Sequence, residues 1–316
     1  MTEQLPVDTL AAVGESAALA RIFPRLPEAT STILGPGDDA AVVAAPDGRF
    51  VVTTDMMIHG PDFRLAWSTP FDLGWKAAAS NLSDIAAMGA VPTALVVALA
   101  APADSPVSLL EGIADGLREA CAELAPGCGV VGGDLSVSET LTIAVTAFGD
   151  LEGRAPVTRS GAQIGDAVAV AGDLGLAAAG LRMLFEHGVH DVTPLRGWVE
   201  IEAQLAPRPP IALGRVAALA GATAMIDLSD GLALDAARVA RASGLALNLF
   251  SSELTPDGLD GGEDHSLLAT FPAGSELPAG FRAIGVATSG VGVLVDDVPY
   301  EPGGWDPFTG WDGGSG

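Results

Sequence analysis

Six aspartates of the chain lie in or beside short segments rich in glycine, serine and threonine: Asp38, Asp55, Asp84, Asp134, Asp227 and Asp230. Most of these segments follow an apolar stretch typical of a strand, so the backbone can direct the carboxylates toward one cleft. Carboxylates gathered without basic partners repel one another and resist ionising together. Hard divalent cations relieve that repulsion, and Mg²⁺ binds a few carboxylates together with phosphate oxygens of a substrate. The pattern therefore indicates metal-dependent phosphate chemistry.

Taken singly, each motif also has a structural explanation. Gly-Pro-Gly-Asp-Asp around Asp38 is typical of a turn. The segment from Asp227 to Gly231 is typical of a capped helix start, with Ser229 or Asp230 as the cap. It also offers two carboxylates and a hydroxyl at a helix N-terminus, a favourable place for phosphate. Five such motifs in one chain, each an aspartate at the end of a strand, favour the chemical interpretation.

Composition argues against several classes of function. The length of 316 residues suggests two domains. Forty acidic residues against fifteen basic ones give a net charge of −25, which argues against nucleic acid or an anionic membrane as a partner. The two cysteines, Cys121 and Cys128, are too few for a disulfide framework and fit a reducing compartment. No N-terminal signal peptide is apparent, and glycine and prolines interrupt the uncharged run over 85–103. We expect a soluble cytoplasmic protein.

The elements that would position the carboxylates alternate between strands and helices. We expect an N-terminal helix through Leu10 and Ala17, strands at 41–43, 50–54, 94–100, 141–148, 167–171, 222–226, 245–249 and 291–295, and helices over 71–88, 105–124, 172–185 and from about 231 to 242. Ser105 and Pro106 form the predicted start of the second long helix. On the helix over 71–88, Lys76, Ser80 and Asp84 form one polar stripe. The turn-rich segment 149–166 marks a domain boundary near residue 150.

Several kinase classes are excluded by missing motifs. The chain has no Gly-x-x-x-x-Gly-Lys-Ser/Thr loop, and Lys76 is its only lysine. The His-Arg-Asp and Asp-Phe-Gly signatures of protein kinases are missing as well. The four histidines, His59, His187, His190 and His265, show no metal-site spacing. The phosphate chemistry must therefore depend on the aspartates.

In order and spacing, the motifs resemble those of the thiamine-monophosphate kinase family. They are Gly-Pro-Gly-Asp-Asp-Ala-Ala, Thr-Thr-Asp-Met, Asn-Leu-Ser-Asp-Ile-Ala-Ala-Met-Gly-Ala, Gly-Gly-Asp, Thr-Arg-Ser-Gly-Ala, Ile-Asp-Leu-Ser-Asp-Gly-Leu and Gly-Gly-Glu-Asp-His, followed by the Gly-Trp-Asp-Pro-Phe tail. The resemblance runs from about Ile33 to Phe308. It implies the two-domain α+β fold shared with aminoimidazole ribonucleotide synthetase. An N-terminal ATP-binding α/β domain over 1–150 would precede a C-terminal α/β domain over 151–316 that contacts the substrate.

The resemblance also implies a reaction and its residues. A homodimer would phosphorylate thiamine monophosphate to thiamine diphosphate with ATP and several Mg²⁺ ions. The metal ligands would be Asp38, Thr53, Thr54, Asp55, Asp84, Asp134, Asp227 and Asp230. ATP would contact Gly133, Asp134, Arg159 and Ser229, and the thiamine moiety would contact Glu263 and Trp305. No general base is expected, because the nucleophile is a phosphate oxygen with a second pKa of about 6.

One position departs from the family pattern. Relatives usually have Gly-x-His-Phe where this chain has Gly60-Pro61-Asp62-Phe63. Asp62 either contacts the cationic thiazolium of the substrate or is a loop residue turned to solvent. The first interpretation predicts an effect of Asp62 on the KM for thiamine monophosphate rather than on kcat.

Three alternatives to this function are open. A selenophosphate synthetase would need a reactive cysteine or selenocysteine near the N-terminus, whereas the first cysteine here is Cys121. A hydrogenase-maturation relative would need a C-terminal cysteine, and none follows Cys128. A non-catalytic nucleotide-binding module would not need the whole acidic set.

Overall fold

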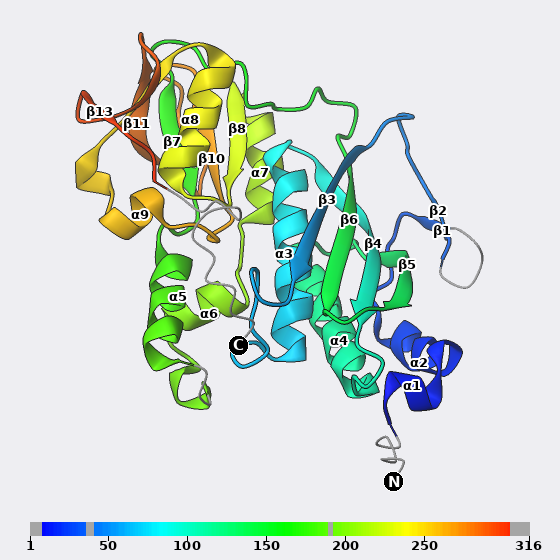
Figure 1. Ribbon diagram of the computed structural model, residues 1–316. Coiled ribbons are helices and arrows are strands. Elements are labelled where there is room, and N and C mark those ends of the chain that lie inside the picture. The colour runs from blue at the N-terminus through cyan, green and yellow to red at the C-terminus, as the bar shows by residue number, and fades with distance from the viewer. Residues whose placement is uncertain (1–7, 36–40, 189–191, 304–316) are drawn as a thin grey trace.

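A four-stranded sheet forms the N-terminal half of the structure, a computed structural model that describes residues 8–35, 41–188 and 192–303 (Figure 1). Its strand order is β3-β6-β4-β5, and only β4 and β5 run parallel. The strands are β3 (Val51–Ile58), β4 (Val91–Ala101), β5 (Val130–Val137) and β6 (Thr142–Asp150). A short pair, β1 (Thr32–Leu34) and β2 (Val42–Val43), precedes them.

A seven-stranded sheet in the order β13-β12-β9-β11-β7-β10-β8 forms the C-terminal half. Its strands are β7 (Ala167–Ala171), β8 (Ala224–Leu228), β9 (Ala246–Leu249), β10 (Ser266–Phe271), β11 (Arg282–Thr288), β12 (Gly292–Val295) and β13 (Val298–Tyr300). The mixture of sheets and helices confirms the predicted α+β class. The first sheet ends at Asp150 and the second begins at Ala167, and the domain bounds 1–150 and 151–316 stay a prediction.

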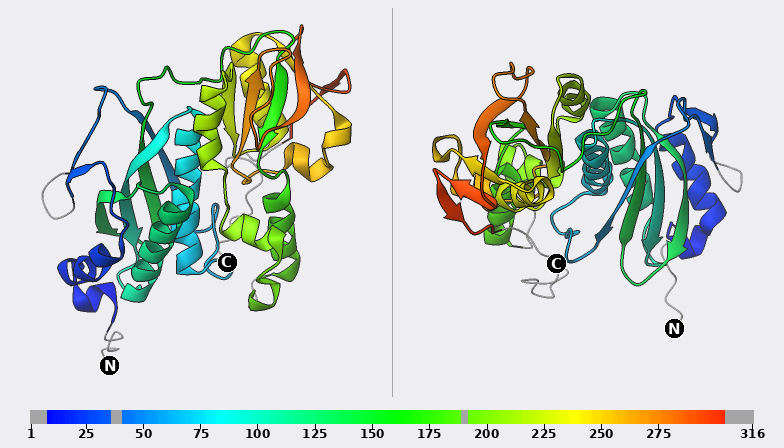
Figure 2. Two further views of the ribbon diagram at one scale, coloured as in Figure 1. Left: turned by 180° about the vertical axis from the view of Figure 1, so that it is seen from behind. Right: turned by 90° about the horizontal axis from the view of Figure 1, so that it is seen from above.

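Helix α3 lies between the two sheets (Figure 2). It packs on β3 and β6 from one side and on β8, β10 and α7 from the other, and 14 of its 18 residues are buried. The helices are α1 (Leu10–Val13), α2 (Glu15–Ile22), α3 (Pro70–Ala87), α4 (Val107–Leu124), α5 (Leu176–His187), α6 (Val199–Leu205), α7 (Ile211–Leu219), α8 (Leu232–Ser243) and α9 (Pro256–Asp260). Within the described ranges, none of them is both long and apolar enough to cross a bilayer.

Glycines allow the neighbouring helices to approach α3 closely. A Cβ atom on Gly116 of α4 would lie 2.0 Å from Phe71 O, and one on Gly214 of α7 would lie 2.1 Å from Ala86 O. The start of α3 is fixed by a capping box, in which Thr69 and Asp72 each accept a hydrogen bond from the other's backbone N–H. The helix is thus set in position at its first turn and along two faces.

Three of the key aspartates lie inside strands, whereas the sequence analysis predicted that they come just after the strands. Asp55 is in the middle of β3, because β3 pairs with β6 as far as Ile58 opposite Thr142. Asp134 lies within β5 opposite Ala98 of β4, and Asp227 lies within β8. Each of these aspartates therefore lies in a paired segment of its sheet.

Helix boundaries also differ from the predictions. The N-terminal helix is broken at Gly14, whose φ of +76° ends α1 and begins α2. Pro106 is itself the N-cap of α4, without a side-chain cap from Ser105. The N-cap of α8 is Gly231 rather than Ser229 or Asp230. Capping therefore does not account for the Asp227–Gly231 segment.

Several elements have no counterpart among the predicted ones, and α6, α7, β10 and β11 are among them. Every residue of β10 is buried, so the strand shows no alternation of polar and apolar side chains. The helix α7 is rich in alanine and lacks a strong polar face. Burial on both faces removes the periodic pattern of β10. In α7 the buried stripe consists of Ile211, Gly214 and Ala217, and the exposed face includes Leu219, so polarity does not mark the two faces.

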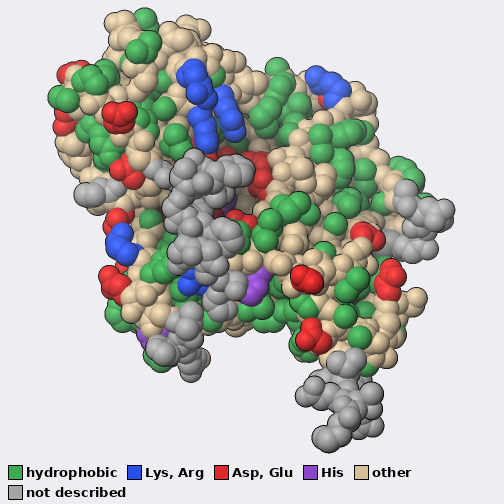
Figure 3. Space-filling view, in the orientation of Figure 1, with side chains coloured by type: hydrophobic (Ala, Val, Ile, Leu, Met, Phe, Trp, Pro, Cys, Tyr) green, Lys and Arg blue, Asp and Glu red, His purple; other side chains and the backbone are tan. Residues whose placement is uncertain are grey.

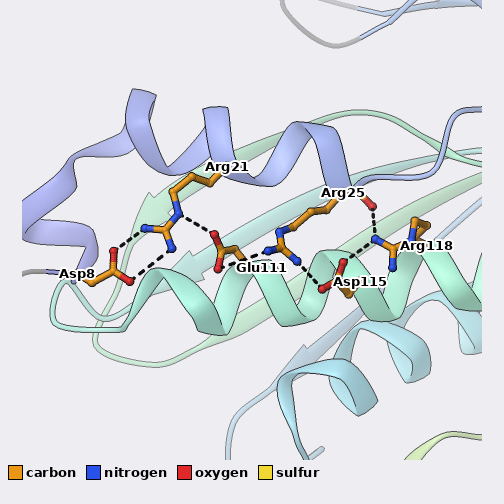
Figure 4. Close-up of polar contacts among 6 residues, drawn as sticks. All are labelled: Asp8, Arg21, Arg25, Glu111, Asp115 and Arg118. Atoms are coloured by element: carbon orange, nitrogen blue, oxygen red, sulfur yellow. Dashed lines mark hydrogen bonds and ion pairs between the residues drawn. The ribbon is translucent and has the colours of Figure 1, made fainter.

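A chain of ion pairs fastens the N-terminal helix α2 to α4 (Figure 4). Arg21 pairs with Asp8 and Glu111, and Arg25 pairs with Glu111 and Asp115. Arg118 extends the network through Asp115. Each pair is partly exposed and contributes little alone, but the shared partners fix α2 over the edge of the first sheet.

We predict that Gly116→Ala destabilises the protein by about 1–3 kcal/mol, because the added methyl group meets the backbone of α3 at a contact that cannot relax. Denaturant unfolding followed by circular dichroism measures this change. Ser108→Ala, at an exposed position of the same helix, is the control and should leave stability within about 0.5 kcal/mol. Equal midpoints for both variants would contradict the close packing of α3 and α4.

Candidate functional site

The N-terminal half contributes Thr53, Asp55 and Asp84 to one cluster. Alternate residues of β3 face α3, so Thr53 and Asp55 point toward that helix. Thr53 Oγ1 donates to Asp84 Oδ2 at 2.7 Å, and the backbone N–H of Asp55 donates to Asn81 Oδ1 at 3.1 Å. The strand and helix thus present two carboxylates and a hydroxyl on the side that faces the second sheet.

The C-terminal half contributes Asp227, Asp230 and His265 opposite this surface. His265 Nδ1 lies 3.6 Å from Asp227 Oδ2, which is an ion-pair distance and too long for a hydrogen bond. Ser83 Oγ on α3 donates to the carbonyl oxygen of His265 at 3.1 Å and joins the two halves. His265 is buried. Figure 3 shows acidic side chains in the recess between the two halves.

Burial and mutual repulsion raise the pKa values of Asp84 and Asp55. Burial, followed by Asp227 and Asp55, raises the pKa of Asp84 to about 7, against the hydrogen bond from Thr53, which lowers it. Burial and the charges of Asp227, Glu263 and Asp230 raise the pKa of Asp55, against the lowering effect of His265. The protein therefore does not fully offset the negative charge of these carboxylates.

The turn after β8 uses part of its hydrogen-bonding capacity internally. Asp230 Oδ2 pairs with Arg238 Nη2 at 2.6 Å, and the backbone N–H of Asp230 donates to Asp235 Oδ2 at 3.1 Å. Burial raises the pKa of Asp235 to about 7, although Arg238 lowers it. The Asp235 carboxylate thus already accepts a hydrogen bond from the backbone N–H of Asp230, at the turn where the sequence analysis found a favourable place for phosphate.

The donor set suits Mg²⁺ in its chemistry. All the donors of Thr53, Asp55, Asp84, Asp227 and Asp230 are oxygen atoms, which hard cations prefer. The raised pKa values of Asp55 and Asp84 indicate charge that a cation would offset. In the described part of the chain, no three His, Cys, Asp or Glu side chains converge on one point as metal ligands would. Asp38, also predicted as a ligand, lies outside the described residues.

Two other predicted ligands, Thr54 and Asp134, lie on the opposite face of the first sheet. Thr54 Oγ1 donates to Val145 O at 3.0 Å and accepts from Thr146 Oγ1 at 3.1 Å. Asp134 shares this outer face and accepts from Ser136 Oγ at 3.0 Å. Strands β3 and β5 are the two edges of the sheet, so Asp134 lies about 14 Å from Asp55 across three strand spacings. The single acidic set expected from the sequence is divided into two groups within one chain.

The predicted ATP contacts are distributed over both groups. Gly133 lies beside Asp134 in β5, where a Cβ atom would be 2.0 Å from Val97 O, so only glycine fits. Ser229 lies at the end of β8, and its carbonyl oxygen accepts from Glu263 N at 2.8 Å. Arg159 is exposed on the segment next to β8, where Thr158 O accepts from Met225 N at 3.0 Å.

A cavity of about 350 Å³ adjoins the acidic cluster and contains two of the predicted substrate residues. Asp62, Glu263 and Lys76 line it, and apolar side chains of α5 and α6 form much of its wall. The Arg64 guanidinium lies 4.7 Å from the Trp67 ring centroid and 4.9 Å from that of Phe185. The sequence did not reveal this wall, because its residues come from separate segments that only the fold brings together. Trp305, the third predicted substrate contact, lies outside the described residues.

Asp62 is held by its own loop. Its Oδ2 accepts from Ile58 N at 2.6 Å, and the side chain is half-buried at the cavity wall. Burial raises its pKa, against the lowering effect of the hydrogen bond from Ile58. Asp62 therefore lies partly exposed at the cavity wall, and its contact with the thiazolium stays a prediction.

A second cavity, of about 570 Å³, lies between α2, α4 and the edge of the first sheet. Leu19, Ile22 and Leu117 belong to its mostly apolar lining, and Gly133 and Asp134 border it. The ion pairs between α2 and α4 close one side of this space. This mostly apolar cavity therefore lies next to Asp134.

Comparisons with known proteins agree with this geometry. The domain family described as AIR synthase related protein, N-terminal domain, matches residues 37–151. Thiamine-monophosphate kinase of Mycobacterium tuberculosis is 43% identical over 96% of this chain and 92% of its own length. The enzyme of Corynebacterium glutamicum is 41% identical over 80% of this chain and 81% of its own. The chain belongs to the thiamine-monophosphate kinase family.

Solved structures support the same assignment. Thiamine monophosphate kinase from Aquifex aeolicus is 34% identical with a TM-score of 0.73, over 82% of this chain and 91% of that one. A structure described as AaThiL complexed with AMPPCP and TMP has the same identity and a TM-score of 0.75, over 85% and 90% of the two chains. Hydrogenase maturation protein HypE, 20% identical with a TM-score of 0.66, shares the fold alone. The two-domain fold expected of this kinase family is thereby confirmed.

We predict that Asp84→Asn stabilises the metal-free kinase at alkaline pH. The pKa of Asp84 is about 7 in the folded protein, so its carboxyl group ionises more easily in the unfolded chain. The folded protein therefore loses stability as pH rises from about 4 through 7. Asparagine removes this loss and can still accept from Thr53. In EDTA, the variant should melt above the wild type at pH 8 and close to it at pH 4.5.

The control for this measurement is Asp104→Asn, which changes the same charge at an exposed position. It should leave the difference between the two pH values unchanged. If Asp84→Asn lowers the melting temperature at pH 8, Asp84 is not an uncompensated carboxylate in the folded protein.

Proposed function

We propose that the protein transfers the γ-phosphoryl group of ATP directly to the phosphate of thiamine monophosphate, giving thiamine diphosphate and ADP, with Mg²⁺ at the acidic cluster. Family membership supports the substrate, as does the related structure described with AMPPCP and TMP. The observation that carries the proposal is the position of the uncompensated carboxylates next to a cavity with a negative side chain, Glu263.

The chemistry needs alignment more than acid–base catalysis. The attacking phosphate oxygen is already largely ionised at neutral pH, because phosphate has a second pKa of about 6. The obstacle is the repulsion between two polyanions, and bound Mg²⁺ would supply charge neutralisation there. Asp55, Asp84, Asp227 and Asp230 are the proposed ligands. They come from both halves of the chain, so the two halves together determine the geometry.

Thiamine monophosphate fits the 350 Å³ cavity with its phosphate directed toward the cluster. The apolar wall of α5 and α6 suits the two rings, and Glu263 supplies a negative charge for the thiazolium. Glu263 also acts on the pKa of Asp55, so this side chain stands between the cavity and the cluster. Asp62 lines the same cavity and is the proposed contact on the loop side.

The nucleotide and the second acidic group suggest a homodimer. Val52, Met56 and Ile58 are exposed on the outer face of β3, the same face that carries Thr54 and Asp134. An exposed apolar face on an edge strand is typical of an interface. We propose that the base of ATP occupies the 570 Å³ cavity of one chain, near Gly133 and Asp134, while its phosphates reach the acidic cluster of the partner.

We predict that the purified protein forms thiamine diphosphate and ADP in equal amounts from thiamine monophosphate and ATP. The products, separated by chromatography, should vanish in EDTA and return with excess Mg²⁺. Asp227→Asn should lower kcat by at least about a hundredfold while the far-UV spectrum stays native, because a ligand of the Mg²⁺ that neutralises the transferring phosphates is lost. Activity on unphosphorylated thiamine instead, or none on the monophosphate, would overturn the proposal.

We predict that two inactive variants restore each other if the site is shared between subunits. Asp134→Asn and Asp84→Asn should each be inactive alone. Coexpressed, half of the dimers are hybrids with one intact site of two, so about a quarter of wild-type activity should return. Separately tagged chains identify the hybrids, and the double variant Asp84→Asn/Asp134→Asn coexpressed with itself is the control. Inactive hybrids would mean that both residues serve the same site from one chain.

A further inference from the structure

Lys76, the only lysine of the chain, is buried at the wall of the substrate cavity. It projects from α3 and is 6% exposed. A buried ammonium group is costly unless charges and hydrogen bonds surround it. Its surroundings therefore decide its role.

Three acceptors surround the ammonium group. Lys76 Nζ forms an ion pair with Glu263 Oε2 and donates to the backbone carbonyl oxygen of Gln204 at 3.2 Å. With the Gln204 amide in the orientation that satisfies both of its ends, the side-chain oxygen accepts from Lys76 Nζ at 3.2 Å, and the amide nitrogen donates to Ala177 O at 3.0 Å. An ammonium group has three N–H donors, so none is left for a substrate phosphate.

Glu263 is the partner whose position depends on this contact. It follows two glycines and has a φ of +71°, which few residues other than glycine adopt. Its Oε2 is buried against Lys76, while about a third of the side chain (34%) remains exposed at the cavity. Burial raises the pKa of Glu263, but Lys76 and then His265 lower it below its usual value. The lysine thus holds the carboxylate in one direction and keeps it negative.

We propose that Lys76 is a positioning residue: it fixes Glu263 so that one carboxylate oxygen faces the ring end of the cavity and selects a cationic ring over a neutral one. This inference rests on the proposed function, because the cationic ring is the thiazolium of thiamine monophosphate. Lys76 acts through Glu263 and does not touch the transferring phosphoryl group. The pair is therefore a specificity device for the substrate, held by α3, the helix that also carries Asp84.

A purely structural role for the ion pair makes a different prediction. If Lys76 only ties α3 to α6, its loss lowers stability and affects every ligand alike. If Lys76 positions Glu263, its loss weakens the binding of a cationic substrate more than the binding of a neutral one of the same shape. The comparison of two ligands in one variant therefore separates the two roles.

The test measures binding of thiamine monophosphate and of its neutral analogue, in which a thiophene replaces the thiazolium, by calorimetry with Mg²⁺ and a non-hydrolysable ATP analogue. The wild type should prefer the cation. Lys76→Met and Glu263→Gln should each reduce that preference by about tenfold or more. In turnover, Lys76→Met should raise the KM for thiamine monophosphate while the KM for ATP stays unchanged and kcat changes less than threefold.

Two further variants keep the test decisive. Arg208→Met removes another cation, which pairs with Glu123 and lies 4.6 Å from the Trp75 ring, outside the cavity lining. It should leave the preference at the wild-type value. Lys76→Met/Glu263→Gln removes both charges and avoids an unpaired buried carboxylate. Because the two residues act as one unit, it should lose no more preference than either single variant.

The outcomes are distinguishable from failure of the proposed function. A wild type that makes no thiamine diphosphate would refute the function itself. A wild type that is active and prefers the cation, with an unchanged preference in Lys76→Met, would overturn the positioning role. An equal loss of affinity for both ligands in folded Lys76→Met would assign the ion pair a structural role only.

Discussion

Helix α3 is buried between two sheets, and the rest of the molecule is arranged around that burial. One face packs on the N-terminal sheet and another on β8, β10 and α7, so a single hydrophobic core spans both halves. Close packing at Gly116 and Gly214 leaves α3 little room to shift. Lys76, Asn81 and Asp84 lie on this one rigid element, which explains why site residues from distant segments keep a fixed relation.

The same burial sets the electrostatics of the site. Asp84 and Asp55 lie near the carboxylates of the opposite half, so desolvation and repulsion raise both pKa values. A fold selected for stability alone would replace such residues by neutral ones. Their presence is the usual cost of a functional site, where a bound cation and phosphates complete the charge balance. The Asp84 carboxylate therefore lowers the stability of the metal-free protein, whereas the proposed function needs it.

In the cavity next to this cluster, by contrast, a buried positive charge is paired. There a buried lysine meets a glutamate, and the remaining acceptors of Gln204 complete its hydrogen bonds. In the acidic cluster Arg238 pairs with Asp230 at its margin, whereas the ammonium group of the cavity lies among three acceptors. Under the proposed function, Asp84 and Lys76 of the same helix α3 would thus serve two separate places, one for metal and phosphate and one for a positively charged ring.

The sequence by itself determined the α+β class, the change of sheet near residue 150 and the identity of the acidic residues, because turn, capping and strand patterns are local. It could not place Asp55, Asp134 and Asp227 within their strands, since strand length depends on pairing with partners far along the chain. It missed β10, whose complete burial removes periodicity, and α7, whose exposed face carries apolar residues such as Leu219. Only the tertiary structure divided the acidic set between two faces of a sheet and brought Lys76 to Glu263, because facing and proximity across elements are properties of packing.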